Sequence, residues 1–314
     1  MRRSLDNVSS DQPHGEPLTI RAGRRAVTVS RPDKVLFPAD GVTKRDLAEH
    51  YARVAPAMVP LVRGHPVALE RFPDGIQGMR FYHKNMKHTP EWVRKVRVGK
   101  RDGELDQVVA EDAATLVWMA DQACITPHIW LSRADELMQP DQLIVDLDPP
   151  EGKFAEARRV ALVVRRMLED LGLPSYPKTT GGKGIHVMVP LDRKWRFDAV
   201  RGFADQLGAV MVADDPRRLT MEFRKEKRGD RLFVDMGRNA YAQHAVAPFA
   251  VRPRDGAPVA TPLDWSEVED RRLKPERFTI KAVAARVERG DDPWGPLRGR
   301  SLTKPAAKLG RVTG

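Results

Sequence analysis

The sequence predicts an α+β fold in which mixed or antiparallel sheets are flanked by helices. Short apolar runs typical of strands are interspersed with amphipathic segments typical of helices, without a regular repeat of strand–helix–strand units. The clearest helix is expected from Phe154 to Leu171, because Gly172 and Pro174 then stop the helical pattern. The clearest strand is the buried run 142–148, which ends in two carboxylates.

Composition narrows the class of protein. The 314 residues suffice for one large domain or two small ones, and the net charge of +11 favours a polyanionic partner such as nucleic acid over a merely arginine-rich composition. The single cysteine, Cys124, excludes an internal disulfide framework and a cysteine-based zinc site. No apolar run approaches 18 residues and no secretory signal begins the chain, so we expect no membrane contact and a cytoplasmic location.

The first half of the chain alternates turns and strands around two helical segments. Residues 1–17 are polar and are expected to be disordered. A helix is expected to begin at Thr43, because Asp46 stands at the capping-box position and Leu47 and Tyr51 follow with helical spacing. The remaining expected elements are a hairpin over 18–30, strands over 66–72 and 79–84, a turn at 99–103 and a helical or mixed segment over 112–125.

The second half predicts the remaining strands and helices. The expected strands are 142–148, 185–190, 219–223 and 231–235, and the expected helices are 154–171, 197–210 and 280–289. We therefore expect a folded domain over residues 18–290. Residues 291–314 carry Gly, Pro and Lys and are predicted to form a basic, flexible tail.

Two segments deliver carboxylates at strand ends. Asp146 and Asp148 point to the same side of their strand, about 7 Å apart, because strand side chains alternate faces. Asp235 ends the apolar run 232–235. If the two strands are neighbours, the three acids form a cup suited to Mg²⁺ or Mn²⁺ and to the two-metal chemistry of phosphoryl transfer. The alternatives are an ordinary Asp-Pro turn and an unrelated third acid.

A glycine-rich segment lies between the two acidic strands. Residues 177–186 combine glycines with Thr179, Thr180, Lys183 and His186 and lead directly into a strand. Glycines allow successive N–H groups to face an anion, and the lysine and hydroxyls add donors. This is no Walker A loop, because the spacing differs and a strand follows. A plain hairpin and a core histidine are the alternatives; together with the acids, a nucleoside triphosphate site explains the segment better.

A short motif at residues 100–103 has a different interpretation. Lys100 to Gly103 matches K-x-D-G, the nucleotidyl-lysine signature of ATP-dependent ligases. The sequence lacks the later glutamate–glycine and lysine segment of a ligase adenylation domain, and Asp-Gly between valine-rich strands is typical of a hairpin turn. We interpret this motif as a turn.

Six segments in register resemble the polymerase domain of bacterial ligase D, a member of the archaeo-eukaryotic primase superfamily. They are Asp-Leu-Asp-Pro at 146–149, Lys-Thr-Thr-Gly-Gly-Lys-Gly-Ile-His at 178–186, Phe-Val-Asp-Met-Gly-Arg-Asn at 233–239, Asp33 to Pro38, Ala247 to Arg252 and the Phe81–Tyr82 pair. The resemblance spans roughly residues 18–290. It implies the primase-polymerase fold, with two interlocked subdomains.

The resemblance also implies a function. Members are template-assisted nucleotidyltransferases that extend 3′ ends and fill gaps in non-homologous end joining, prefer ribonucleotides and often use Mn²⁺. Expected cofactors are two Mn²⁺ or Mg²⁺ ions, with nucleoside triphosphates as substrate. Expected partners are DNA with 5′-phosphorylated gaps or ends, a Ku homologue and a separate ATP-dependent DNA ligase, at the nucleoid. A stand-alone primase and a non-catalytic DNA-end module are the alternatives.

The family's functional residues carry over to named positions. The implied catalytic and metal-binding residues are Asp146, Asp148 and Asp235. The implied nucleotide-binding residues are Thr180, Lys183, His186 and Arg252 for the triphosphate, the aromatic pair Phe81 and Tyr82, and Arg71, Lys84, His128 and Arg238. The implied 5′-phosphate ligands are Lys34 and Lys44. One departure is Glu70, which stands beside Arg71 where some members have a basic residue near the triphosphate.

Overall fold

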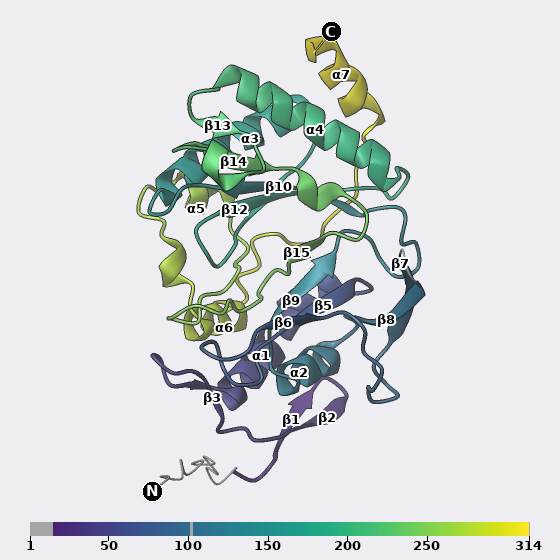
Figure 1. Cartoon of the computed structure of the whole chain (residues 1–314), viewed down its shortest axis with the longest axis vertical. Helices are drawn as coiled ribbons and strands as arrows, with labels where there is room; N and C mark the ends of the chain where they lie inside the picture. The colour runs from purple at the N-terminus through teal and green to yellow at the C-terminus, as the bar shows by residue number, and fades with distance from the viewer. Residues whose placement is uncertain (1–14, 101–102, 314) are drawn as a thin grey trace, which may run out of the picture.

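Two sheets organise the two lobes of the molecule (Figure 1). The computed structural model describes residues 15–100 and 103–313, so most of the segment predicted to be disordered, residues 1–14, lies outside the described residues. One lobe contains a six-stranded sheet and the other a five-stranded sheet. This arrangement of antiparallel and mixed sheets with flanking helices confirms the predicted α+β class.

The lower lobe in Figure 1 is built on the six-stranded sheet, with β6 paired to β5 beside the path β15-β9-β5-β8-β7. Helices α1 and α2 contact each other, and the hairpin β1–β2 packs against both. Helix α1 begins as predicted, because the Asp46 carboxylate accepts from the Thr43 N–H at 2.7 Å and the Thr43 hydroxyl caps the Asp46 N–H. The elements are β1 Leu18–Ala22, β2 Arg25–Val29, β3 Val35–Phe37, β4 Val42–Thr43, α1 Lys44–Val62, β5 Pro66–Arg71, β6 Phe81–His83, β7 Lys95–Lys100, β8 Gly103–Val109, α2 Ala113–Asp121, β9 Cys124–Trp130 and β15 His244–Val246.

The upper lobe is built on the five-stranded sheet in the order β11-β12-β10-β14-β13. Val145 and Leu147 of β10 are fully buried in the core that includes Val160 of α3 and Val200 of α4. Because strand side chains alternate, Asp146 lies on the opposite face of the sheet from this core. The elements are β10 Gln142–Asp148, α3 Phe154–Asp170, β11 Tyr176–Thr179, β12 Ile185–Pro190, α4 Phe197–Asp214, β13 Leu219–Thr220, β14 Leu232–Asp235 and α5 Trp265–Glu269.

The chain crosses between the lobes repeatedly, which confirms the interlocked subdomains. After β14 of the upper sheet, β15 returns to pair with β9 of the lower sheet. Helix α5 then contacts α3, and helix α6 (Ile280–Glu288) contacts α1 of the lower lobe. No helix in the described ranges is long and apolar enough to cross a membrane.

The prediction of a flexible tail was wrong for its last part. Residues Thr303–Thr313 form helix α7, which contacts α4 and lies at the top of Figure 1. Leu302 and Leu309 are buried there, so two apolar side chains in a basic segment suffice to dock it. Other boundaries differ too: α4 extends four residues beyond the predicted end at Val210, and β13 and β6 are shorter than the predicted 219–223 and 79–84. The segment predicted over 112–125 divides into α2 and the start of β9.

Asp141 ties the two lobes together immediately before β10. Its carboxylate contacts His65 Nε2 at 2.9 Å and accepts from Arg133 Nε at 2.6 Å. His65 and Arg133 belong to loops next to β5 and β9 of the lower lobe. Burial raises the pKa of Asp141, but the contacts with His65 and Arg133 outweigh it and lower the pKa to about 2.

We expect Asp141 to make the stability of the protein sensitive to acid. Because the folded pKa of about 2 lies below the ordinary 3.8, its contribution is complete above about pH 4 and is lost as the pH falls through about 2. The shift corresponds to about 2 kcal/mol of unfolding free energy. Urea unfolding of the wild type and Asp141→Asn should differ by that amount near neutrality and converge in acid. A difference that stays constant with pH would contradict this role of the charge.

Candidate active site

The three predicted acids meet on one face of the upper sheet. Strand β10 lies between β12 and β14, and Asp146 stands directly opposite His186 on one side and Asp235 on the other. Asp148 lies two residues further along the same face. The structure therefore brings together two segments almost ninety residues apart, as the hypothesis of neighbouring strands required.

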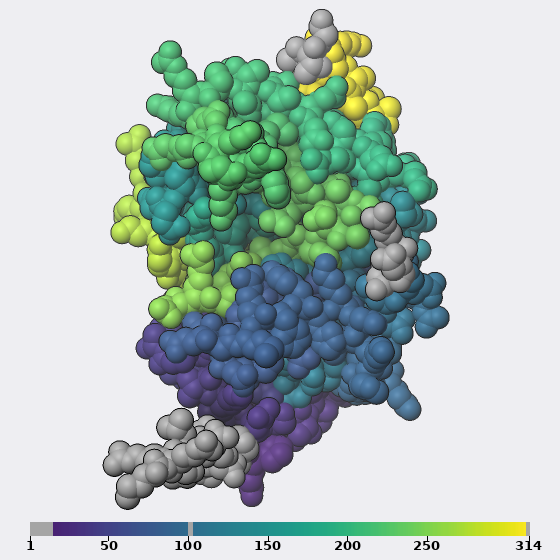
Figure 2. Space-filling model, in the orientation of Figure 1, coloured from purple at the N-terminus to yellow at the C-terminus, as the bar shows by residue number. Residues whose placement is uncertain are grey.

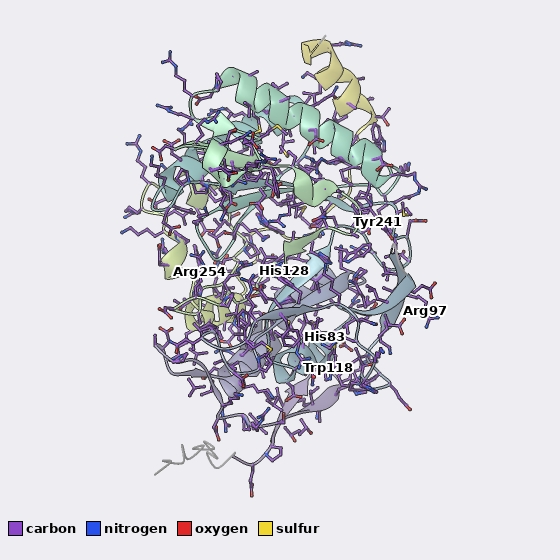
Figure 3. All side chains as sticks on the ribbon, in the orientation of Figure 1. His83, Arg97, Trp118, His128, Tyr241 and Arg254 are labelled. Carbon is purple, nitrogen blue, oxygen red and sulfur yellow. The ribbon has the colours of Figure 1, made fainter. Side chains whose placement is uncertain are left out.

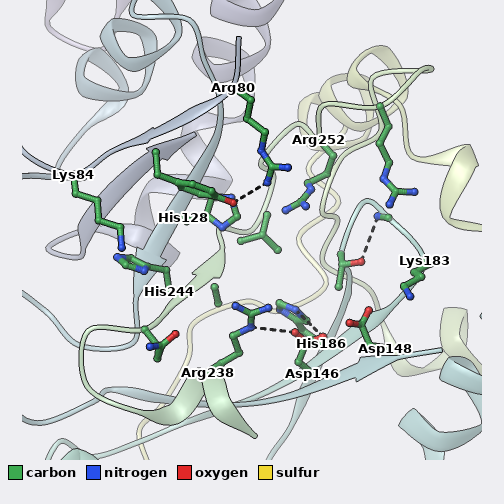
Figure 4. Close-up of a pocket in the computed structure, with 17 residues that line it drawn as sticks. Arg80, Lys84, His128, Asp146, Asp148, Lys183, His186, Arg238, His244 and Arg252 are labelled. Carbon is green, nitrogen blue, oxygen red and sulfur yellow. Dashed lines mark hydrogen bonds and ion pairs between the residues drawn. The ribbon is translucent and has the colours of Figure 1, made fainter. Parts of the chain in front are cut away.

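Asp146 is the most buried of the three acids and has two cationic or polar neighbours. His186 Nε2 lies 3.3 Å from its Oδ1, and Arg238 Nε donates to its Oδ2 at 3.3 Å (Figure 4). Burial raises the pKa of Asp146, but His186 and Arg238 outweigh that effect and hold the pKa well below its ordinary value. Asp146 is thus ionised throughout the physiological range.

The other two carboxylates have the opposite electrostatic environment. Burial, followed by the negative charge of Asp146, raises the pKa of both Asp148 and Asp235. Asp235 is held in place by the Gly237 N–H, which donates to its Oδ1 at 2.7 Å. One buried and two partly buried acids whose mutual repulsion is incompletely offset attract a cation, and oxygen ligands fit Mg²⁺ or Mn²⁺.

Arg238 separates two of the acids in this structure. Its Nε lies between Asp146 Oδ2 at 3.3 Å and Asp235 Oδ2 at 3.6 Å. Accordingly, the described residues contain no group of three or more His, Cys, Asp or Glu side chains arranged closely enough to hold a metal ion. The chemistry of the donors, carboxylate oxygens of net negative charge, fits divalent cations.

The glycine-rich segment closes one side of the site. The Thr180 hydroxyl accepts from the N–H groups of Gly182 and Gly184 at 3.3 and 3.2 Å, which folds residues 180–184 into a tight turn between β11 and β12. A Cβ at Gly181 would lie 2.5 Å from Cγ of Arg252, and one at Gly184 would lie 2.4 Å from the Leu147 carbonyl. These glycines therefore let the turn approach both Arg252 and the acidic strand closely.

A cavity of about 520 Å³ lies between the lobes and joins these groups (Figure 4). Figure 2 shows the face of the molecule on which the atoms of the two lobes meet. Ten of the predicted site residues line the cavity: Tyr82, Lys84, His128, Asp146, Asp148, Thr180, Lys183, His186, Arg238 and Arg252. Two carboxylates thus lie in a wall that is otherwise strongly basic, which suits a polyanion bridged by cations.

Two predicted nucleotide-binding residues do not reach the cavity. Arg71 and Phe81 are paired across β5 and β6, on the opposite face from the pair Glu70 and Tyr82. Arg71 Nε donates to the Gln122 carbonyl at 2.6 Å, and its guanidinium lies over the Phe81 ring at 5.4 Å. His83 shares this face, and Figure 3 shows it deeper in the lower lobe than His128. Strand alternation therefore corrects the assignment: only Tyr82 of the aromatic pair faces the cavity.

Comparison with known proteins identifies the family. A model of the LigD primase-polymerase domain matches residues 43–294. The chain belongs to this family. The fold class and the resemblance predicted from the motifs are thereby confirmed, and a primase-polymerase domain is a nucleotidyltransferase.

Individual relatives agree with this assignment. The multifunctional non-homologous end joining DNA repair protein LigD of Mycobacterium tuberculosis is 32% identical over 281 residues, which are 86% of this chain and 37% of that protein. LigD of Pseudomonas aeruginosa is 30% identical over 325 residues, 97% of this chain and 38% of that protein. The chain therefore spans less than two fifths of the length of these relatives.

A solved structure shares the fold. The polymerase domain from Mycobacterium tuberculosis ligase D, determined in complex with DNA, superposes with a TM-score of 0.81 at 31% identity. The match covers 86% of this chain and 97% of that domain. The primase-polymerase fold is thus present nearly in full.

Several cavity residues of this primase-polymerase domain were missed by sequence reasoning. They are Arg80, Gln243, His244 and Arg254. Arg80 and Arg254 flank recognised motifs, so proximity to Tyr82 and Arg252 was a usable signal. His244 lies on β15, which pairs with β9 through a connection of more than a hundred residues, and no local pattern indicates that pairing.

The two predicted phosphate-binding lysines differ in exposure. Lys34 is partly exposed and pairs with Asp74 at 3.0 Å. Lys44 is buried, and its ammonium group contacts the Ser30 carbonyl, the Ser30 hydroxyl and Asp121 at 2.8, 3.0 and 2.8 Å. Burial lowers the pKa of Lys44 despite the bond to Asp121. Only Lys34 thus presents its charge to an incoming phosphate without exchanging a buried contact.

The first and last residues of the K-x-D-G segment, Lys100 and Gly103, lie at the adjoining ends of two paired strands. Strands β7 and β8 pair from Lys95 to Lys100 and from Gly103 to Val108, as expected for a hairpin. Residues 101 and 102 lie outside the described residues. Strands β7 and β8 belong to the six-stranded sheet of the lower lobe, whereas β10 belongs to the five-stranded sheet of the upper lobe.

Proposed function

We propose that this protein adds nucleotides, preferentially ribonucleotides, to 3′ ends and fills short gaps at DNA breaks during non-homologous end joining. The observation that carries the proposal is the position of Asp146 between His186 and Asp235, at the floor of a cavity whose other walls are basic. Membership in the primase-polymerase family and the DNA-bound relative support the same reaction.

The cavity orients a nucleoside triphosphate in one direction. Lys183, Arg252 and the turn formed by Thr180 gather at one side and would hold the triphosphate. Tyr82 lies on the opposite lobe, with 46% of its surface exposed, and offers a face to the base or sugar. In this orientation the α-phosphate would lie over the carboxylates of β10, where the primer 3′-hydroxyl would attack and pyrophosphate would leave.

The acids fit two divalent cations, Mn²⁺ or Mg²⁺, held by Asp146, Asp148 and Asp235. Such ions, when bound, lower the pKa of the attacking hydroxyl and stabilise the charge of the leaving pyrophosphate. The protein's own residues complete the arrangement: Asp146 stays ionised beside His186 and Arg238, and the cations of the cavity offset the charge of the triphosphate. Binding and alignment of the two substrates account for the rest of the rate enhancement.

Two replacements of Thr180 should distinguish the effect of its hydroxyl group from the effect of its size. Thr180→Val removes the acceptor for the Gly182 and Gly184 N–H groups, so we expect the KM for nucleotide to rise about tenfold because the turn loses its shape. Thr180→Ser keeps the hydroxyl and should stay within about twofold of the wild type. Steady-state incorporation measures both, and equal effects of the two variants would contradict the role of the hydroxyl.

The DNA substrate would be recognised through a 5′-phosphate. Lys34 and Lys44 would grip it, with Lys44 exchanging its contact with Asp121 for the phosphate. Phosphate contacts fix the position of DNA without reading its sequence, which suits an enzyme for breaks of any sequence.

Lys34→Ala should abolish the preference for 5′-phosphorylated gaps. The wild type is expected to fill a phosphorylated gap about tenfold faster than a 5′-hydroxyl gap at low enzyme concentration, and the variant should fill both at the slower rate. Lys194→Ala, which removes an exposed lysine from the other lobe, is the matched control. A preference that persists in Lys34→Ala would remove this lysine from the phosphate site.

One assay tests the proposed function as a whole. A one-nucleotide gap with a 5′-phosphate is offered rNTP or dNTP, with Mn²⁺, Mg²⁺ or a chelator. We expect templated incorporation that the chelator abolishes, with the rNTP favoured. No incorporation under any of these conditions would refute the proposal, and synthesis without a primer would reassign the chain to priming.

The partners follow from the same proposal. A filled gap still contains a nick, so a DNA ligase must act next, here proposed to be a separate ATP-dependent enzyme. A Ku homologue would hold the ends together, and the work on broken chromosomal DNA would place the protein at the nucleoid in the cytoplasm.

A further inference from the structure

Glu70 is a fully buried carboxylate beside the cavity. It lies on β5 directly opposite Tyr82 of β6 and has no exposed surface. Its Oε2 accepts from His128 Nε2 at 2.7 Å, and its Oε1 forms an ion pair with Arg80 Nε at 2.8 Å. Each carboxylate oxygen thus lies beside a different side chain that lines the cavity, through a hydrogen bond at Oε2 and an ion pair at Oε1.

The protonation states of Glu70 and His128 follow from their burial and from the charged side chains around them. Burial raises the pKa of Glu70, but the hydrogen bond from His128 and the charges of His128, Arg252 and Arg80 together lower it. Burial lowers the pKa of His128 to about 4, despite the contact with Glu70. At neutral pH an anionic Glu70 therefore accepts a hydrogen bond from a neutral His128, which carries its ring hydrogen on Nε2.

The two side chains that contact Glu70, namely Arg80 and His128, form its two arms, and both contact Tyr82. Arg80 Nη2 donates to the Tyr82 hydroxyl at 3.1 Å, and the guanidinium lies over the Tyr82 ring, 5.6 Å from its centroid (Figure 4). His128 meets the same ring edge-on, with 5.4 Å between the centroids. Glu70, Arg80, Tyr82 and His128 thus form a closed ring of contacts, which we call the Tyr82 support.

The Tyr82 support explains an otherwise costly arrangement. An aromatic ring on a short strand, 46% exposed, has many orientations, and Arg80 is 55% exposed and gains little from a surface contact alone. A buried carboxylate near a site for triphosphate also opposes nucleotide binding by its charge. The loss of side-chain freedom and the repulsion of the triphosphate are both offset if the carboxylate fixes the Tyr82 ring before the nucleotide binds.

We propose that Glu70 is a positioning residue that acts through Arg80 and His128 to fix the ring of Tyr82 as the surface against which the base or sugar of the nucleotide packs. Arg80 is the second positioning residue of this set. The inference rests on the proposed function, because it concerns the nucleotide site of that reaction. It reinterprets the departure at position 70: the acid organises the base side of the cavity and makes no contact with the phosphates.

Kinetics of single variants test the two arms. Glu70→Gln keeps an acceptor for His128 but loses the charge that holds Arg80, so we expect the KM for nucleotide to rise about tenfold while kcat and the KM for gapped DNA stay within about threefold. Arg80→Gln should reproduce this pattern. An equal loss in kcat, or an unchanged KM, would overturn the proposal, since a merely structural role does not affect the nucleotide KM alone.

A double-mutant cycle tests whether the effect passes through Tyr82. Tyr82→Phe keeps the ring but removes the hydroxyl that Arg80 binds. If Glu70 acts through this contact, Glu70→Gln in the Tyr82→Phe background should raise the KM by less than about threefold. Full additivity of the two effects on KM would overturn the proposed coupling.

The controls separate this inference from the proposed function. A wild type without incorporation refutes the function itself, whereas an active wild type with an unaltered KM in Glu70→Gln refutes only the Tyr82 support. Thermal unfolding shows whether Glu70→Gln folds. If it does not fold, the double-mutant cycle between Arg80→Gln and Tyr82→Phe decides. Arg80 is exposed, so its replacement is compatible with folding, and Glu70 keeps its hydrogen bond from His128.

Discussion

Asp148→Asn is expected to reduce nucleotide incorporation at least about a thousandfold without reducing stability. If Asp148 is one of the three proposed anionic ligands, its loss weakens metal-assisted stabilisation of the transition state by several kcal/mol, and each 1.4 kcal/mol is a factor of ten in rate. The fold should not suffer, because burial and Asp146 raise the pKa of Asp148 and its ionised form is unfavourable in the absence of a cation. Single-turnover incorporation and thermal unfolding measure the two quantities.

The two readouts make the result decisive. Gapped-DNA binding should remain near the wild-type level, since Asp148 faces the nucleotide cavity. Asp146→Ala is a poorer test, because it also removes the charge that His186 and Arg238 contact. Retained incorporation by Asp148→Asn would refute the metal assignment, and a strong fall in stability would show that its charge is already satisfied within the protein.

Arg252→Gln is expected to raise the KM for nucleotide about fiftyfold or more. Burial lowers the pKa of Arg252, and its Nε has no hydrogen-bond partner among the described residues. A largely buried guanidinium whose donors are unused is prepared for an anion, and two charge-assisted hydrogen bonds account for a loss of this size. Saturation kinetics with rNTP in Mn²⁺ measure the effect.

Arg254→Gln is the matched control for this prediction. Arg254 also lines the cavity, but its side chain is exposed, so the same change should raise the KM by no more than about fivefold. Equal losses in the two variants would show that net positive charge, and not the particular position of Arg252, holds the triphosphate.

The sequence predicted the segments that carry the chemistry because local rules govern them. The capping box of Thr43 and Asp46, the helix after Asp148 and the apolar run of β10 follow from spacing and residue type alone. The glycines at 181, 182 and 184 indicated backbone N–H groups that could face an anion. The alternation of faces along β10 was sufficient to place Asp146 and Asp148 on one side.

The same alternation separates the aromatic pair of β6. Phe81 and Tyr82 are adjacent strand residues that point to opposite faces, so only one of them can line the cavity. The buried state of Lys44 and the docking of α7 were equally inaccessible, because each depends on residues such as Ser30, Asp121 or those of α4 that are remote in sequence.

The amino-acid sequence by itself determined the chemical groups of the site, the strands that carry them and the family to which the chain belongs, since these depend on local patterns of residues. The tertiary structure decided which of those groups share a space. The pairing of β10 with β14 put Asp235 opposite Asp146, and the return of β15 to β9 brought His244 to the cavity. The pairing of distant strands depends on the packing of whole sheets, which no local pattern specifies.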